Sequence, residues 1–249
     1  MISGYALDGL PEIEPGYDLA GGIVETLAPE RIQPGDVVVV AHKAVSKSEG
    51  RIRALRDVTP GERALAIARE QDRDPRHVQV ILDEARYVVR AERGILITET
   101  RHGYVCANSG VDASNVPGEE VLVLLPVDPD ASARGLRARL QELTGVAPGV
   151  VITDSFGRAW RAGQCDVAIG CAGVRPVADL RGEKDIHGRE LKATVIAVAD
   201  ELAAAADLCR SKAGAQPVVL IRGAERQVTE TDGPGAAALV RAREQDLFR

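Results

Sequence analysis

The sequence predicts a mixed α+β fold in which buried strands and amphipathic helices share one chain. Three short runs are continuously apolar, at 37–41, 121–125 and 218–221, as in strands that are covered on both faces. Other segments favour helices: apolar residues recur at helical spacing after residue 128, and 199–209 is rich in alanine. A chain of 249 residues with 45% apolar content is long enough to bury a proper core. We therefore expect mixed sheets with flanking helices.

The composition excludes some classes of protein and disfavours others. The formal charge is −6 and the isoelectric point is near 5.4, which disfavours nucleic acid as a partner. The mean hydropathy of −0.07 and the lack of a long apolar run argue against a membrane span. No secretory signal is visible at the N-terminus, so we expect a cytoplasmic protein. The four cysteines match no common zinc spacing and are expected to be reduced, mostly buried thiols.

In the first half of the chain, a turn-rich stretch at 5–16 leads into a predicted helix at 19–27. The strand at 37–41 follows a turn, and directly after it come His42, Lys43, Ser46, Lys47 and Ser48. Cations and hydroxyls beyond a buried strand can grip a phosphate, although exposed loop lysines are common. A helix is then expected at 62–71 with Leu65, Ile67 and Ala68 as its apolar positions, followed by a mixed segment at 77–93 and a strand at 95–98.

In the second half, Asp128 caps a predicted helix with Pro129 at its first position and with Leu136, Leu140 and Leu143 on one face. A strand at 150–153 precedes a glycine turn at 156–161, and a small-residue strand is expected at 167–173. The segment 181–190 is predicted to be a solvated loop, and 191–198 a half-exposed strand. The helix at 199–209 is broken by 210–217 before the last buried strand.

Two stretches, at 100–115 and 151–170, contain residue types that can bind a metal ion. Each places an apolar or small-residue run directly before an acidic residue, Asp112 in one and Asp154 in the other. Two carboxylates at strand ends, with Asn115 and the Ser155 hydroxyl nearby, make hard oxygen ligands for Mg²⁺ or Mn²⁺. The competing interpretation is that both are turn or helix caps.

The 156–161 turn also allows two interpretations. Arg158, Trp160 and Arg161 can form a wall for an anionic, ring-bearing substrate, or a surface turn with its aromatic ring packed inward. The sequence lacks a G-x-x-x-x-G-K-[ST] loop, a G-x-G-x-x-G fingerprint and a G-x-S-x-G elbow. A nucleotide would therefore be held by a less familiar kind of site.

Both central stretches resemble the coenzyme F-420:L-glutamate ligases, and the resemblance covers nearly the whole chain. It includes GLPEIEPG, GDVVVVAHKAVSKSEGR, LLPVDPDASA, VADELAAAADL and the closing DLFR. The resemblance implies a two-lobed, intertwined homodimer in a cytoplasmic pathway. It also implies that residues 1–249 form a single γ-glutamyl ligase unit, without the C-terminal nitroreductase-like domain of some relatives.

The resemblance also implies a GTP site, a divalent ion and roles for particular residues. Asp112 and Asp154 would hold Mg²⁺ or Mn²⁺, and Ser155, which replaces the usual Thr, would assist a second ion. Asp112, Asp154 and Lys47 would be the catalytic set, and potassium is a candidate further ion. His42 stands where many members carry Ser, and Lys212 where some place an amide ligand. The implied nucleotide-binding residues are Leu10, Pro11, Glu12, Ile13, His42, Lys47, Asn115, Arg210, Ser211, Lys212, Ala213, Gly214, Ala215, Gln216 and Pro217.

The function that the resemblance implies is GTP-dependent addition of L-glutamate to a deazaflavin F-420 precursor, with further γ-linked extension. The carboxylate would be activated as an acyl phosphate, because amide formation from a free carboxylate is uphill in water. One alternative is a metal-dependent phosphohydrolase that uses the same carboxylates to activate water. Another is a non-catalytic binder of a deazaflavin or nucleotide.

Overall fold

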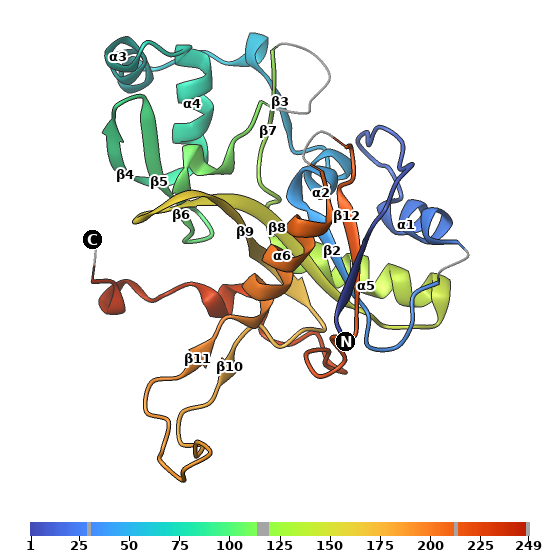
Figure 1. The fold of residues 1–249 in the computed structure, drawn as a ribbon. Helices are drawn as coiled ribbons and strands as arrows, with labels where there is room; N and C mark the ends of the chain where they lie inside the picture. Colours follow the sequence, from blue (N-terminus) through green and yellow to red (C-terminus); the bar gives the residue numbers. More distant parts are fainter. Residues whose placement is uncertain (29–30, 114–119, 212–213, 248–249) are drawn as a thin grey trace.

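The computed structural model describes residues 1–28, 31–113, 120–211 and 214–247, and its central feature is a five-stranded sheet (Figure 1). The strand order is β1-β12-β2-β8-β9, and β2 and β8 are parallel while the other neighbours are antiparallel. The strands are β1 (Ser3–Ala6), β2 (Val37–Ala41), β8 (Gly149–Arg158), β9 (Arg161–Ala172) and β12 (Val218–Arg222).

Helices cover both faces of this sheet. Alternate residues of β2 point to opposite faces, so Val38 and Val40 pack into one core and Val37 and Val39 into another. The first core includes residues of α1 (Leu19–Leu27) and α5 (Pro129–Thr144), and the second includes α6 (Val198–Cys209). Burial on both sides explains why these strands are continuously apolar in sequence.

Helix α5 begins as the sequence predicts, but its buried face is different. Asp128 accepts a hydrogen bond from the Ala131 amide at 2.9 Å, and Pro129 is the first helical residue. Leu140 is buried, but Leu143 is 41% exposed, so the predicted 136–140–143 stripe is wrong at its end. Arg137 takes part of the buried face instead, because its guanidinium donates to the Pro148 carbonyl and pairs with Asp232.

A second group of elements has its own hydrophobic core, visible at the upper left of Figure 1. It contains α3 (Glu62–Gln71), α4 (Pro75–Glu84) and a three-stranded sheet of β4 (Ala85–Glu92), β5 (Ile95–Thr100) and β6 (Val105–Ala107). Leu122 of β7 (Val121–Val123) belongs to the same core, and β7 pairs with the short strand β3 (Ile52–Ala54). In α3 the buried residues are Ala64 and Ala68, so the prediction that Leu65 is a core position is wrong.

Two predicted segments have a different structure. Residues 156–158 continue β8 and pair with β9, so the predicted turn is reduced to the two residues before Arg161. Trp160 lies there with 75% of its surface exposed and is not packed inward. The segment 191–198 contains only a two-residue strand, β11 (Val195–Ile196), which pairs with β10 (Ala178–Asp179) at the root of a projecting arm.

The remaining elements are a short helix, α2 (His42–Ser48), and four 3-10 turns at Leu55–Asp57, Asn108–Gly110, Ala236–Leu239 and Arg243–Gln245. No helix in the described ranges has the length and apolar character needed to cross a membrane. The predicted α+β class is confirmed. The homodimer stays a prediction, because the structure contains one chain.

Candidate active site

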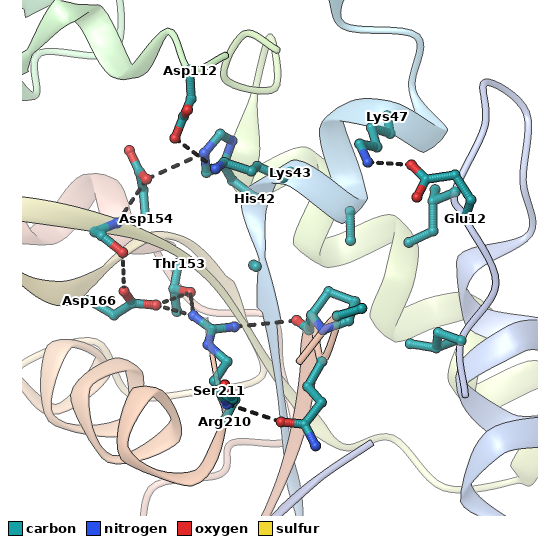
Figure 2. Close-up of a pocket in the computed structure, with 18 of the residues that line it drawn as sticks. Glu12, His42, Lys43, Lys47, Asp112, Thr153, Asp154, Asp166, Arg210 and Ser211 are labelled. Atoms are coloured by element: carbon teal, nitrogen blue, oxygen red, sulfur yellow. Dashed lines mark hydrogen bonds and ion pairs between the residues drawn. The ribbon is translucent and has the colours of Figure 1, made fainter. Parts of the chain in front are cut away.

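A cavity of about 720 Å³ lies at the carboxyl end of β2, beside residues 153–155 of the parallel strand β8 (Figure 2). Such positions beyond the carboxyl ends of parallel strands commonly bind ligands, because side chains from neighbouring strands converge there. The lining residues are Leu10, Pro11, Glu12, Ile13, Ala41, His42, Lys43, Ala44, Lys47, Asp112, Thr153, Asp154, Ser155, Gln164, Asp166, Arg210, Ser211, Ala215, Gln216 and Pro217.

Sheet register brings three distant segments to this cavity. Ala41, the last residue of β2, is opposite Thr153 in β8. The Ala41 amide donates to the Pro217 carbonyl at 2.8 Å, which holds the segment before β12 beside the same strand end. The chain then turns directly into α2, so the cations after β2 lie on a short helix and not in a loop.

The sequence suggested that Asp154 follows the end of a strand, but the residue lies inside β8. The register with β9 shifts between Ile152 and Thr153, immediately before Asp154. Such bulges re-aim side chains and are frequent beside active sites. His42 Nε2 lies 3.3 Å from Asp154 Oδ1, although Nε2 makes no hydrogen bond.

Asp112 reaches the cavity from a tight turn and not from a strand end. Asn108, Ser109 and Gly110 all have positive φ, and a Cβ at Gly110 would meet the Leu125 side chain at 2.7 Å. After this turn, Asp112 exchanges backbone hydrogen bonds with Val123. Its carboxylate lies 2.7 Å from Lys43 Nζ, so Lys43 neutralises one of the two predicted metal ligands.

Lys47 links the N-terminal loop to α2. The Lys47 side chain is mostly buried, and its Nζ donates to Glu12 Oε1 at 2.5 Å. Glu12 belongs to the 10–13 loop that the resemblance assigns to the nucleotide. Both predicted groups therefore line one cavity, and Lys47 offers a cation inside it.

A buried network around Asp166 was missed from the sequence. The Asp166 carboxylate is 1% exposed and accepts hydrogen bonds from the hydroxyls of Thr153 and Ser155, at 2.9 and 2.6 Å. The Arg210 guanidinium forms an ion pair with the same carboxylate and also donates to Thr153 Oγ1 at 3.0 Å. Asp166 could have been found because it lies on a strand opposite a hydroxyl-bearing residue. Finding it, however, would have required knowing how β8 and β9 pair.

The structure brings together most of the predicted nucleotide residues. Leu10, Pro11, Glu12, Ile13, His42, Lys47, Arg210, Ser211, Ala215, Gln216 and Pro217 all line the cavity, and Gly214 lies in the same segment without lining it. Asn115, Lys212 and Ala213 fall outside the described residues.

Arg158, Trp160 and Arg161 do not line the cavity. They lie at the exposed tip of the β8–β9 hairpin. Their predicted role in substrate binding stays a prediction.

The donor set fits a divalent ion only in part. Asp112 and Asp154 supply the carboxylate oxygens that Mg²⁺ and Mn²⁺ prefer, and an ion held by one or two carboxylates commonly takes its other ligands from phosphates and water. The Ser155 hydroxyl donates to Asp166, so Ser155 is engaged elsewhere. Within the described ranges, no three His, Cys, Asp or Glu side chains are grouped at metal-binding spacing. An ion here therefore needs a substrate or a rearranged Lys43 to complete its ligands.

Comparison with known proteins agrees with the resemblance found in the sequence. A family model described as F420-0:Gamma-glutamyl ligase matches residues 9–223. The chain is 46% identical to the coenzyme F420:L-glutamate ligase of Methanopyrus kandleri, covering 96% of this chain and 94% of that protein. The proteins of the same name from Methanothermobacter thermautotrophicus and Methanocaldococcus jannaschii are 43% and 44% identical, over 100% and 96% of this chain and 99% and 94% of their own lengths.

These matches identify the class of protein as an amide-bond-forming ligase. The chain belongs to the F420-0:gamma-glutamyl ligase family.

Proposed function

We propose that this protein joins L-glutamate to a deazaflavin F-420 precursor, with GTP as the co-substrate, and then extends the product by γ-linked glutamate. The observation that carries the proposal is that four separate parts of the chain line one cavity. They are the 10–13 loop, the cations of α2, two carboxylates and the 210–217 segment. Three cationic side chains, Lys43, Lys47 and Arg210, lie there in an otherwise acidic protein, which suits nucleotide phosphates.

The chemistry follows from the need to activate a carboxylate. The substrate carboxylate oxygen attacks the γ-phosphorus of GTP, the bond to the β-phosphate oxygen breaks, and GDP leaves. The amine of L-glutamate, having lost a proton, then attacks the acyl carbon and expels phosphate, which leaves an amide. No protein nucleophile is required, so positioning and electrostatics supply the rate enhancement.

Each residue contributes through binding or charge. Lys47 lies where it can pair with a phosphate oxygen once its contact with Glu12 is exchanged. Asp112 and Asp154 would hold the Mg²⁺ or Mn²⁺ ion, which offsets the negative charge on the transferring phosphoryl group when it is bound. Asp166 and Arg210 fix the wall formed by β8, β9 and the end of α6.

Mass spectrometry of the acceptor tests this function. A deazaflavin precursor is incubated with the protein, GTP, Mn²⁺ and L-glutamate, and the mass of the acceptor is followed. Added glutamyl units that require both GTP and glutamate support the ligase, and ATP in place of GTP tests the choice of nucleotide. Release of GDP and phosphate without a gain in acceptor mass would instead indicate the phosphohydrolase. Binding of acceptor or nucleotide without turnover would indicate the non-catalytic binder.

A further inference from the structure

His42 is buried in the cavity with one ring nitrogen that has no hydrogen-bond partner. The residue is 2% exposed, and its Nε2 is among the buried polar atoms that make no hydrogen bond. The imidazole faces the Asp154 carboxylate across 3.3 Å (Figure 2). A buried polar atom without a partner destabilises the folded protein, so a group that binds Nε2 is expected.

The spacing of the two side chains suits two ligands of one ion. Neighbouring ligands in an octahedral shell with bonds of about 2.0–2.2 Å lie roughly 3 Å apart. In that arrangement, the nitrogen lone pair points at the ion and not at the oxygen of the neighbouring ligand. Two ligands of one ion therefore lie close together without forming a hydrogen bond to each other. His42 Nε2 and Asp154 Oδ1 are related in this way.

The other ring nitrogen also suits this role. His42 Nδ1 lies 3.4 Å from Ser46 Oγ, one turn further along α2. A histidine ligand commonly donates its second ring N–H to a nearby acceptor, which fixes the tautomer and leaves the first nitrogen with a free lone pair. Ser46 is itself fully buried, so this contact is held within the protein.

We propose that His42 Nε2 and an Asp154 oxygen ligate the divalent ion of this site together, which makes the ligand set mixed nitrogen and oxygen. This rests on the proposed metal site of the ligase and gives His42 a role that serine, common at this position in the family, does not reproduce. Imidazole is a better ligand for first-row transition ions than for Mg²⁺. The protein should therefore bind Mn²⁺ in preference to Mg²⁺, and this preference should be weaker in a variant with serine at position 42.

The test is a Mn²⁺ binding titration on the intact protein without nucleotide or acceptor, followed by electron spin echo spectroscopy of the bound ion. The wild type should show ¹⁴N coupling from an imidazole. His42→Ser should lose that coupling, bind Mn²⁺ at least about tenfold more weakly, and change its affinity for Mg²⁺ much less. His187→Ser, at an exposed position on the arm, is the matched control and should behave as the wild type.

Two results would overturn the proposal. Mn²⁺ bound without ¹⁴N coupling, with equal affinity in His42→Ser and reduced affinity in Asp154→Asn, would leave a carboxylate site that excludes His42. Absence of Mn²⁺ binding at millimolar concentration would also remove His42 as a ligand of the free protein. Thermal unfolding of each variant shows that it is folded, and glutamyl transfer measured separately keeps failure of this proposal distinct from failure of the proposed function.

Discussion

Two carboxylates from different parts of the chain, Asp112 and Asp154, are the residues on which the proposed chemistry most depends. Both were predicted from the sequence, because each follows an apolar or small-residue run and because the surrounding segments resemble one family, and both line the cavity. Their local structures could not be found that way. Asp112 follows a turn with three positive φ angles, and Asp154 lies inside a strand after a bulge. Such features depend on contacts with Leu125 and with β9, which local sequence patterns do not reveal.

Replacement of either carboxylate should abolish glutamyl transfer without unfolding the protein. Asp112→Ala and Asp154→Ala would each remove a proposed ligand of an ion that would stabilise the transition state by several kcal/mol, so the rate should fall by at least about a thousandfold. Asp57→Ala removes an exposed carboxylate from a 3-10 turn and should retain full activity. Initial rates with circular dichroism as the folding control measure this. Normal rates in either site variant would remove that carboxylate from the mechanism.

The cysteines should differ sharply in reactivity. Burial raises the pKa of Cys106 and of Cys171 to about 12, while Cys209 is exposed. Since the thiolate is the reactive form, brief treatment with iodoacetamide at pH 8 should alkylate Cys209 first and leave Cys106 and Cys171 unmodified. Peptide mass mapping before and after denaturation checks this prediction. Equal labelling of Cys106 in the native protein would contradict its buried position.

Among the elements, the long hairpin of β8 and β9 does most to build the site, and it was the least predictable. Gly157 suggested a turn, but strand pairing continues past it to Arg158. By contrast, the bounds of α1 and α3 agree with the sequence, because apolar spacing and turn residues define them locally. Helix α2 was missed, since its short sequence of His, Lys, Ala, Ser and Val carries little helical signal and its position follows from packing against β2 and β8.

The buried ion pair between β9 and the end of α6 should be structurally important. Asp166→Ala leaves the buried Arg210 guanidinium with only the longer contact, 3.7 Å, to the Asp207 carboxylate, which should lower the free energy of unfolding by up to about 3–5 kcal/mol. Asp179→Ala breaks an exposed pair with Arg181 and should change the unfolding midpoint little. Urea titration compares the two. A midpoint for Asp166→Ala close to that of the wild type would show that the network contributes no net stability.

At the scale of the whole molecule, fold class and family were predictable, whereas the relation between subunits was not. The α+β class followed from apolar patterning, and sequence similarity over nearly the whole chain established the family. Subunit contacts depend on which exposed apolar side chains meet a partner, and the sequence alone does not show exposure. Trp160 and Ile186, each mostly exposed at the tip of a projecting segment, are such side chains.

The homodimer that the resemblance implies can be tested with these side chains. Light scattering after gel filtration should give twice the 26.4 kDa of one chain. Trp160 is the only tryptophan, so dilution below the dimer dissociation constant should shift its emission to longer wavelength if the hairpin tip lies in the interface. A mass of one chain at micromolar concentration would contradict the dimer. Constant emission during a measured loss of dimer would place Trp160 outside the interface.

The ion pair between Lys43 and Asp112 has a consequence for how the site is loaded. Because Lys43 already balances the Asp112 carboxylate, acidic groups in the cavity repel one another less than they would without the lysine. Chelation with EDTA should accordingly leave the thermal midpoint nearly unchanged, and a large fall would show that a tightly held ion supports the fold. In the proposed site, an incoming cation would take the place of the Lys43 ammonium group beside Asp112, and the released lysine would then be available to pair with the phosphates of the nucleotide.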